Sequence, residues 1–374
     1  MLMNISFKKR TSLILSAVLA ATTFTLAQQQ PLPEWQSQYA VGLNKLAPHT
    51  YVWPYADASD IGKPGGYEQS PYYMSLNGKW KFNWVKNPDN RPKDFYQPFY
   101  YTGGWADINV PGNWERQGYG TAIYVNQPYE FVQGRPQPPV LPDEIPVGVY
   151  QRTFTIPESW DGKRLFVHFD GIYSAAVVWV NGKYVGYTQG SNNDAEFDIT
   201  EFAKVGDNQL SVRVYRWCDG SYLEGQDMWH LSGIHRDVYL VATPKVFVSD
   251  HYITSSLSND ATSGQLNVKL TVDNRDAVQA EKQLNVELLD AEGKTVATGS
   301  ASYQGSANES VDVKLNNLSA LHPWSAEDPY LYTVVVRQAD ADGADEMVFS
   351  TKYGFRKITK SGNLIYINGK RVFF

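Results

Sequence analysis

Apolar and polar residues alternate along many short stretches of this chain. The clearest alternation covers residues 149–156, 164–169, 184–188 and 209–216, and the apolar run 175–180 also predicts a strand. A period of two residues is the signal of a strand with one buried face. Turn residues separate the stretches, and the pair Asn181-Gly182 is typical of a type I′ hairpin. Because no helical period survives the glycine and β-branched content, we expect an all-β domain, a jelly roll over residues 66–244.

A second turn signal lies near the start of this expected domain. Asn77-Gly78 stands before an alternating run in which Trp80, Phe82 and Trp84 share one face. Since Asn-Gly pairs favour tight two-residue connections, we expect a hairpin-type turn here.

The composition changes after Thr243-Pro244, where aromatic residues become fewer and Ser, Thr, Asn, Asp and Val more frequent. Alternating stretches follow at 264–273, 283–289 and 311–315, and we expect 329–337 to be the closing strand. About seven short strands in about 100 residues is the pattern of an immunoglobulin-like β-sandwich. We place this sandwich at residues 245–353, in the broader class that lacks a cysteine pair.

The last residues predict a hairpin whose second strand is cut short. Residues 364–367 are followed by the turn Asn368-Gly369 and by the apolar stretch 371–374. Natural termini are usually polar and loosely held. We therefore expect that the sequence is truncated, and that residues 354–374 begin a further domain.

The N-terminus has the pattern of a secretory signal peptide. Three basic residues at 8–10 precede a short apolar run at 13–21, and small residues precede Gln28. The apolar run is too short for a membrane span. We expect a signal peptide at residues 1–27 and an exported bacterial protein, periplasmic or secreted. Residues 28–65, rich in Pro and Tyr and without a period, predict an extended arm.

The composition narrows the function. The net charge of −6 disfavours nucleic acid, which calls for a basic face. Cys218 is the only cysteine, which excludes an intrachain disulfide and a cysteine-based zinc site. The chain has 11 Trp and 25 Tyr, and these suit both β-sheet cores and the flat faces of sugar rings.

Charge and aromatic surface are most concentrated at residues 217–240. This stretch predicts a long, structured loop between two strands, and loops of that length are usually functional. It holds four acidic residues, Asp219, Glu224, Asp227 and Asp237. Two of them could form the carboxyl pair that glycoside hydrolysis needs. Nothing in the sequence separates this interpretation from acidic residues that only cap backbone N–H groups.

The same stretch holds candidate metal ligands. His230 and His235 are five residues apart, a spacing that suits neither a helix face nor a strand face, so a zinc pair is disfavoured. A hard cation on Asp227 or Asp219 is more credible, because such ions prefer oxygen ligands. Taken alone, the residues indicate exported all-β modules with a polar, aromatic loop that binds sugar.

Five motifs then make the chain similar to a known family. They are S-L-N-G-K-W-K-F at Ser75, P-G-N-W-E-R-Q-G-Y-G-T-A-I-Y-V-N at Pro111, F-D-G-I-Y-S-A-A-V-V-W-V-N-G-K-Y-V-G-Y at Phe169, D-G-S-Y-L-E-G-Q-D-M-W-H-L-S-G-I-H-R-D-V-Y-L at Asp219 and Y-G-F-R-K-I at Tyr353. The chain resembles the N-terminal part of family 2 glycoside hydrolases, and among them the large-subunit type of bacterial β-galactosidase.

The resemblance implies a jelly-roll sugar-binding domain, an immunoglobulin-like domain and then a (β/α)8 barrel. Such enzymes hydrolyse terminal, non-reducing β-D-galactose residues of β-galactosides with retention. Two glutamates and the magnesium ligands of the barrel are expected beyond Phe374, so we expect no catalytic residue and no magnesium ligand in this chain. The chain by itself is then expected to be inactive.

Two residues are expected to reach the sugar by this resemblance. They are Asn126 of the I-Y-x-N motif and Asp227 of the Q-D-M-W motif, and Asp227 is also expected to help hold a sodium ion. Asp219, Arg236 and Asp237 are expected to fix the loop. His230 stands where the family usually has Arg, and His235 where it often has Phe, which leaves substrate preference open.

Other interpretations remain open. A β-glucuronidase or a β-mannosidase of the same family would share these motifs, and its barrel residues would separate it. A non-catalytic carbohydrate-binding module or an adhesin built from tandem sandwiches represents another class. The expected partners are β-galactoside sugars, without nucleic acid and without a membrane span, and a homo-oligomer is possible.

Overall fold

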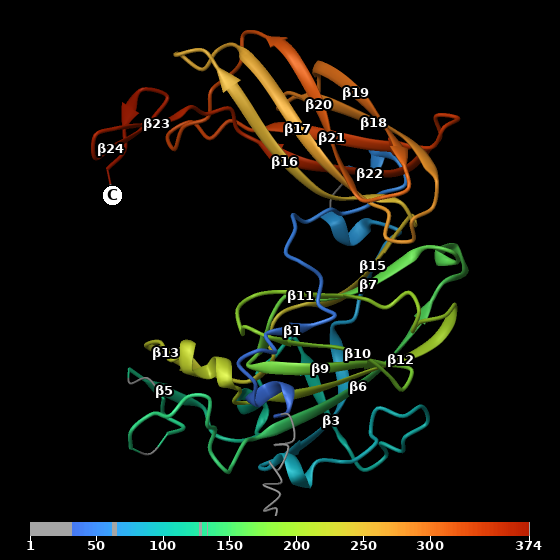
Figure 1. Ribbon diagram of the computed structural model, residues 1–374, viewed down its shortest axis with the longest axis vertical. Helices are drawn as coiled ribbons and strands as arrows, with labels where there is room; N and C mark the ends of the chain where they lie inside the picture. Colours follow the sequence, from blue (N-terminus) through green and yellow to red (C-terminus); the bar gives the residue numbers. More distant parts are fainter. Residues whose placement is uncertain (1–31, 62–65, 127–128, 133, 374) are drawn as a thin grey trace, which may run out of the picture. The chain divides into compact units, whose positions relative to one another are not determined.

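The computed structural model describes residues 32–61, 66–126, 129–132 and 134–373. The expected signal peptide at 1–27 lies outside the described residues. The chain forms antiparallel β-sheets with a few short 3-10 helices (Figure 1). The 3-10 helices are η1 (Glu34–Gln36), η2 (Ala58–Asp60), η3 (Gly66–Gln69), η4 (Pro88–Asn90), η5 (Trp114–Gln117), η6 (Glu158–Trp160) and η7 (Asp219–Leu223). Among the described residues, no helix is long and apolar enough to cross a membrane.

The first sandwich is a jelly roll, as expected. Its larger sheet has seven strands in the order β1-β10-β9-β12-β6-β3-β4. These are β1 (Gly42–Leu43), β10 (Lys183–Gln189), β9 (Ala175–Val180), β12 (Gly206–Tyr215), β6 (Val147–Ile156), β3 (Gly78–Val85) and β4 (Ala106–Val110). The smaller sheet has four strands in the order β11-β7-β15-β2. These are β11 (Ala195–Asp198), β7 (Arg164–Phe169), β15 (Val238–Thr243) and β2 (Tyr73–Ser75).

The core of the jelly roll lies between these two sheets. Phe82, Val212 and Leu240 are among its buried residues and come from β3, β12 and β15. The packing is close at Gly148, where an added Cβ would lie 2.5 Å from the Trp114 ring. A glycine is required there because an indole ring occupies the space that any side chain would need.

The alternation located these strands correctly. β7 and β9 have the expected bounds, and β6, β10 and β12 differ from them by one to three residues at an end. The Asn181-Gly182 turn is also confirmed, because both residues have positive φ, +50° and +83°, as a type I′ turn requires.

Two expectations about this sandwich are wrong. The alternation predicted a half-buried strand at 209–216, but the successive residues Leu210, Ser211 and Val212 of β12 are all buried. The second face carries its own apolar cluster, which includes Val177 and Trp179 and is covered by Trp35 and other residues outside the sheet. Asn77-Gly78 is also not a hairpin turn, because β2 and β3 belong to different sheets. The Asn77 side chain instead accepts the N–H of Val238 at 3.0 Å, which joins the connection between β2 and β3 to β15.

The arm covers this second face of the larger sheet. Trp35 stacks on Tyr215 with ring centroids 4.2 Å apart. The guanidinium of Arg213 lies 5.0 Å from the Trp179 ring, 5.3 Å from the Tyr215 ring and 5.7 Å from the Trp35 ring. Farther along the arm, β1 pairs with β10 and extends the sheet by one edge strand. The arm is therefore fixed by aromatic, cation–π and backbone contacts.

The second sandwich has the expected immunoglobulin-like fold. A three-stranded sheet, β16-β17-β20, faces a four-stranded sheet, β19-β18-β21-β22. The strands are β16 (Phe247–Leu257), β17 (Gly264–Asp273), β18 (Ala280–Leu289), β19 (Thr295–Gly305), β20 (Glu309–Leu318), β21 (Tyr332–Ala339) and β22 (Asp345–Tyr353). The stretch at 329–337 is not the closing strand, because β22 follows β21 and pairs with it.

Three short strands follow at the C-terminal end of the chain: β23 (Ile358–Ser361), β24 (Leu364–Ile367) and β25 (Lys370–Arg371). β24 pairs with β25 across Asn368-Gly369, which confirms the hairpin, and it also pairs with β23. The barrel stays a prediction.

Candidate functional site

Two short strands outside the main sheets bring the predicted sugar-binding residues together. β5 (Ile123–Val125) pairs antiparallel with β13 (Met228–His230), and Val125 lies opposite Met228 (Figure 1). In the same register, Asn126 follows β5 opposite Asp227, which precedes β13. Both side chains are exposed. Two residues that are far apart in the sequence therefore lie across from each other at one end of this β5–β13 ribbon.

Exposed aromatic rings stand beside this pair of residues. Tyr124 is 55% exposed and Trp229 is 58% exposed, and they are opposite each other in the ribbon. Their ring centroids are 5.2 Å apart. A hydrogen bond between the Tyr124 hydroxyl and the Asp227 carboxylate raises the pKa of Tyr124. An amide, a carboxylate and aromatic faces at one surface can bind the hydroxyls and the C–H face of a sugar.

The other acidic residues of the stretch serve the loop. Glu224 accepts hydrogen bonds from the backbone N–H of Ser191 at 2.8 Å and from its hydroxyl at 2.6 Å, and burial raises the pKa of Glu224. Asp219 is partly buried and bonded to the Gln189 side chain, and burial raises its pKa as well. Neither carboxylate is available to a solvent-borne ligand in the way that Asp227 is.

The pair Arg236-Asp237 also makes loop contacts. The Arg236 guanidinium donates to the Asn192 carbonyl at 3.1 Å, and Asp237 accepts from the Asn77 amide at 3.0 Å. Of the four acidic residues in 217–240, Asp227 alone is classed as exposed. The geometry thus separates Asp227 from the other three acidic residues, a distinction that the residues alone left open and that only the family resemblance implied.

The two histidines do not meet at a common site. The ring nitrogens of His230 face Glu130 and, at 3.0 Å, the Gln226 carbonyl. His235 instead bonds the Ser191 carbonyl at 3.0 Å. Within the part of the chain that the structure describes, no group of three His, Cys, Asp or Glu residues could hold a metal ion.

The fit to sodium is incomplete. Asp227 would supply an anionic oxygen, but a hard cation takes about six oxygen ligands, and in the described residues Asp227 belongs to no group of three His, Cys, Asp or Glu residues that could hold a metal ion. Sodium on Asp227, and magnesium elsewhere, stay predictions, and no step is derived through either ion.

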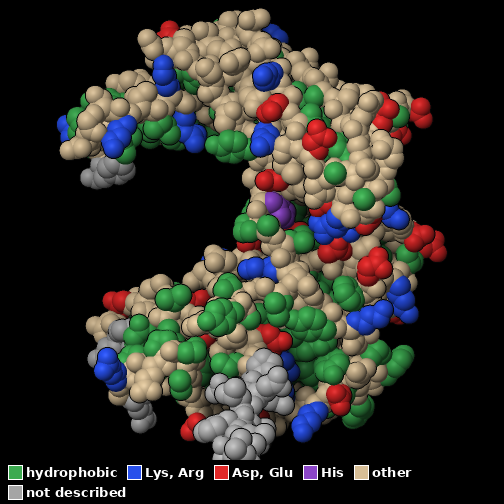
Figure 2. All heavy atoms as spheres, viewed as in Figure 1, with side chains coloured by type: hydrophobic (Ala, Val, Ile, Leu, Met, Phe, Trp, Pro, Cys, Tyr) green, Lys and Arg blue, Asp and Glu red, His purple; other side chains and the backbone are tan. Residues whose placement is uncertain are grey.

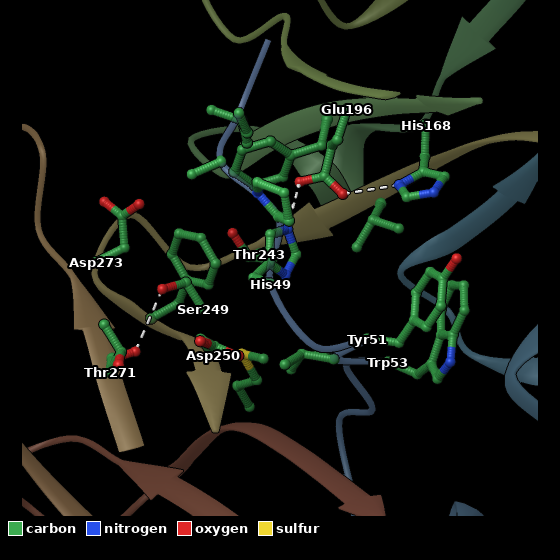
Figure 3. Close-up of a pocket in the computed structure, with 18 of the residues that line it drawn as sticks. His49, Tyr51, Trp53, His168, Glu196, Thr243, Ser249, Asp250, Thr271 and Asp273 are labelled. Atoms are coloured by element: carbon green, nitrogen blue, oxygen red, sulfur yellow. Dashed lines mark hydrogen bonds and ion pairs between the residues drawn. The ribbon is translucent and has the colours of Figure 1, made fainter. Parts of the chain in front are cut away.

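A pocket lined partly by the arm was not foreseen. It has a volume of about 270 Å³ and is lined mainly by apolar and aromatic side chains, with Tyr51 and Trp53 among them (Figure 3). Glu196 faces His168 at 2.9 Å and His49 at 3.4 Å. Burial opposes its ionisation, but the hydrogen bonds from both histidines outweigh burial and hold the pKa of Glu196 at about 2.

The polar groups at this pocket are thus directed at one another, and the sugar site is better assigned to the ribbon. No sequence pattern indicates the pocket, because its walls come from segments with no common motif.

The distribution of surface charge does not favour a polyanion such as nucleic acid as the ligand. On the face of the described residues that Figure 2 shows, Lys and Arg side chains are scattered among acidic and apolar ones. A nucleic-acid site would instead need a gathered basic surface.

A jelly roll that presents such a polar, aromatic ribbon, joined to an immunoglobulin-like sandwich, defines a carbohydrate-binding class of protein. Comparison with family models agrees: residues 73–244 match the description "Glycosyl hydrolases family 2, sugar binding domain", and residues 246–356 match "Glycosyl hydrolases family 2". The chain belongs to glycosyl hydrolase family 2.

Curated relatives are named β-galactosidases. One from Priestia megaterium is 38% identical over 345 residues, which cover 91% of this chain and 33% of the relative. Another from Halalkalibacterium halodurans is 41% identical over 303 residues, which cover 80% of this chain and 29% of the relative. The chain thus spans about a third of the length of the curated relatives it matches.

Solved structures show the same fold. A β-glucuronidase of Bacteroides uniformis, bound covalently to cyclophellitol-6-carboxylate aziridine, superposes with a TM-score of 0.64 at 22% identity. The match covers 80% of this chain and 34% of the other. At this identity the likeness concerns the fold alone.

Proposed function

We propose that this chain provides the sugar-binding part of a β-galactosidase, which hydrolyses terminal β-D-galactose residues of β-galactosides with retention. The observation that carries the proposal is the placement of Asn126 opposite Asp227 on the exposed end of the β5–β13 ribbon. The relatives at 38% and 41% identity support the choice of activity, since both are named β-galactosidases.

The ribbon would hold the sugar rather than cleave it. The Asp227 carboxylate accepts hydrogen bonds from hydroxyls, whereas the Asn126 amide can both donate and accept. Together they would fix the orientation of one sugar ring. The two glutamates that would act as acid/base and nucleophile are expected in a barrel beyond Phe374, so the chain by itself is expected to show no hydrolysis and little affinity for galactose.

Charge favours a galactoside over a glucuronide. By the resemblance, Asp227 is expected near the 6-hydroxyl of the bound sugar, because it is expected to help hold a sodium ion that contacts this hydroxyl. A glucuronide carries a carboxylate at that position, and two like charges at one site disfavour each other. A neutral hydroxyl can instead donate to Asp227. The alternative of a β-glucuronidase therefore requires a cation from outside the ribbon.

The test uses the full-length gene product and compares β-galactoside, β-glucuronide and β-mannoside substrates. We expect hydrolysis of the β-galactoside and competitive inhibition by galactose. Asp227→Asn should raise the inhibition constant of galactose about tenfold or more, the effect of losing a charged hydrogen-bond acceptor. Asp161→Asn, at an exposed aspartate of the same domain, is the control and should change nothing.

Preferential turnover of a glucuronide or a mannoside would refute the activity. An unchanged galactose inhibition constant in the Asp227 variant would remove the ribbon from the site.

Export is a separate part of the proposal. Residues 1–27 would be removed on secretion to the periplasm or the medium, and N-terminal sequencing of the mature protein should then begin at Gln28. A mature protein that keeps Met1 would contradict it. Whether the enzyme forms a homo-oligomer would be read from light scattering of the same preparation.

A further inference from the structure

The backbone makes a tight turn at Asp227. The Gln226 carbonyl accepts the Met228 N–H at 2.8 Å, so Asp227 is the central residue of a three-residue γ-turn. The same carbonyl also bonds Nε2 of His230 at 3.0 Å. One carbonyl oxygen therefore closes the turn and ties it to a side chain from β13.

His230 is held in place from its other ring nitrogen. The residue is 2% exposed, and its Nδ1 pairs with Glu130, whose side chain is 8% exposed. The Gln226 carbonyl can only accept a hydrogen bond, so Nε2 is the nitrogen that donates to it, and Nδ1 faces the Glu130 carboxyl.

The backbone of His230 rests on a buried ion pair. The Arg216 guanidinium donates to the His230 carbonyl at 3.4 Å and lies 3.1 Å from Glu115. Glu115 also accepts the Ser232 N–H at 2.8 Å, and its side chain is fully buried. The backbone of His230 is therefore held by buried polar contacts, while its side chain bonds the turn that contains the exposed Asp227.

Other charged and titratable groups also face the ring. Glu224 interacts with it electrostatically, and the Tyr173 ring lies 6.4 Å from it between centroids. Neither group is bonded to Nε2 of His230, and the bonded partner of that nitrogen is the Gln226 carbonyl.

We propose that His230 is a positioning residue of the sugar site: its Nε2–H holds the Gln226 carbonyl and so fixes the turn that presents Asp227 opposite Asn126. The Nδ1 bond to Glu130 orients the ring for this task. The inference rests on the proposed function, because it assigns the role of His230 through Asp227 at the same site.

Two substitutions separate this role from a structural one. The amide nitrogen of an Asn reaches about the place of Nδ1, and that of a Gln about the place of Nε2. His230→Asn therefore keeps a bond to Glu130 and loses the Gln226 carbonyl, whereas His230→Gln keeps the carbonyl and loses Glu130. In the full-length enzyme, His230→Asn should raise the galactose inhibition constant about tenfold, and His230→Gln by less than about twofold.

A purely structural role predicts the reverse order. The Gln variant leaves the buried Glu130 without its hydrogen-bond partner and should lower the melting temperature more than the Asn variant. The control is His251→Asn, because His251 is also buried and bonds Thr50 through Nδ1, but in the other sandwich. It should leave the inhibition constant unchanged.

Amide hydrogen exchange at Met228 gives a readout that needs no sugar. Exchange should be faster in His230→Asn than in the wild type and nearly unchanged in His230→Gln, because only the former loses the bond to the turn. Equal exchange and equal inhibition constants in the two variants would overturn the inference while the β-galactosidase activity stands. If the wild-type enzyme neither cleaves a β-galactoside nor binds galactose, the proposed function fails. If exchange at Met228 in His230→Asn equals that in the wild type, the inference fails independently of the activity.

Discussion

The buried ion pair between Arg216 and Glu115 lends itself to a stability test. Arg216 follows β12, Glu115 lies in η5, and their side chains are 4% and 0% exposed. Arg216→Met would remove the cation, keep much of the apolar volume and leave a buried carboxylate without its partner. Breaking a buried pair in this way costs about 3–5 kcal/mol of unfolding free energy.

The loss of unfolding free energy in Arg216→Met should depend on pH. Burial already raises the pKa of Glu115, and the Ser232 N–H and the Arg216 charge oppose that rise. Without Arg216 the pKa of Glu115 rises further. A carboxyl with a raised pKa in the folded state loses its contribution as the pH rises through that value. The variant should therefore be least stable at neutral pH and recover toward the acid side of an ordinary glutamate pKa.

The assay is denaturant unfolding of the chain, followed by tryptophan fluorescence. The matched control is Lys81→Met, which breaks a pair of 2.9 Å whose side chains are 45% and 50% exposed. That surface pair should contribute less than about 1 kcal/mol. Adding Glu115→Gln to the Arg216 variant should restore part of the loss, because the buried charge is then gone. If Arg216→Met is no more destabilising than the control, the reasoning is refuted.

Three further predictions concern the jelly roll. Gly148→Ala should cost about 2 kcal/mol or more because its Cβ would overlap a buried ring, while Gly104→Ala, which meets nothing within 4 Å, should be neutral in thermal unfolding. Burial raises the pKa of the Cys218 thiol to about 11, so iodoacetamide should modify it only after denaturation, and rapid native labelling would contradict this. Burial opposes the charge of His168, but bonds to carboxylates outweigh it and raise its pKa to about 9. His168 should therefore contribute on the order of 3 kcal/mol of stability below pH 6.5, which is lost as the pH rises through about 9. His168→Gln should flatten that alkaline loss in a pH series of unfolding curves, and an unchanged slope would rule the histidine out as its source.

The fold was predictable where the signal is local. A strand alternates every two residues, so β7 could be located from the chain alone, and β9 could be located as a short apolar run before a turn signal. The Asn181-Gly182 turn was predictable for the same reason, since both residues tolerate positive φ. Asn77-Gly78 shows the limit, because the same dipeptide there links two sheets.

The candidate site was predictable in part. The motifs that carry the family resemblance singled out Asn126 and Asp227, but their placement across one ribbon depends on the pairing of β5 with β13. The interpretation of His230 missed its contacts, because Glu130 and the Gln226 carbonyl reach the ring only after the chain has turned back on itself.

The sequence by itself determined the all-β class, the positions of many strands and the family of the chain, because these depend on local periods and contiguous motifs. Only the tertiary structure decided which faces are buried and which of the four acidic residues in 217–240 is exposed. Burial and hydrogen bonding join residues that are distant along the chain: Ser191 occupies Glu224 and Asn77 occupies Asp237, while Asp227 remains exposed. No local pattern along the chain encodes such partners. Their presence distinguishes a carboxylate that supports a loop from one that can bind a ligand.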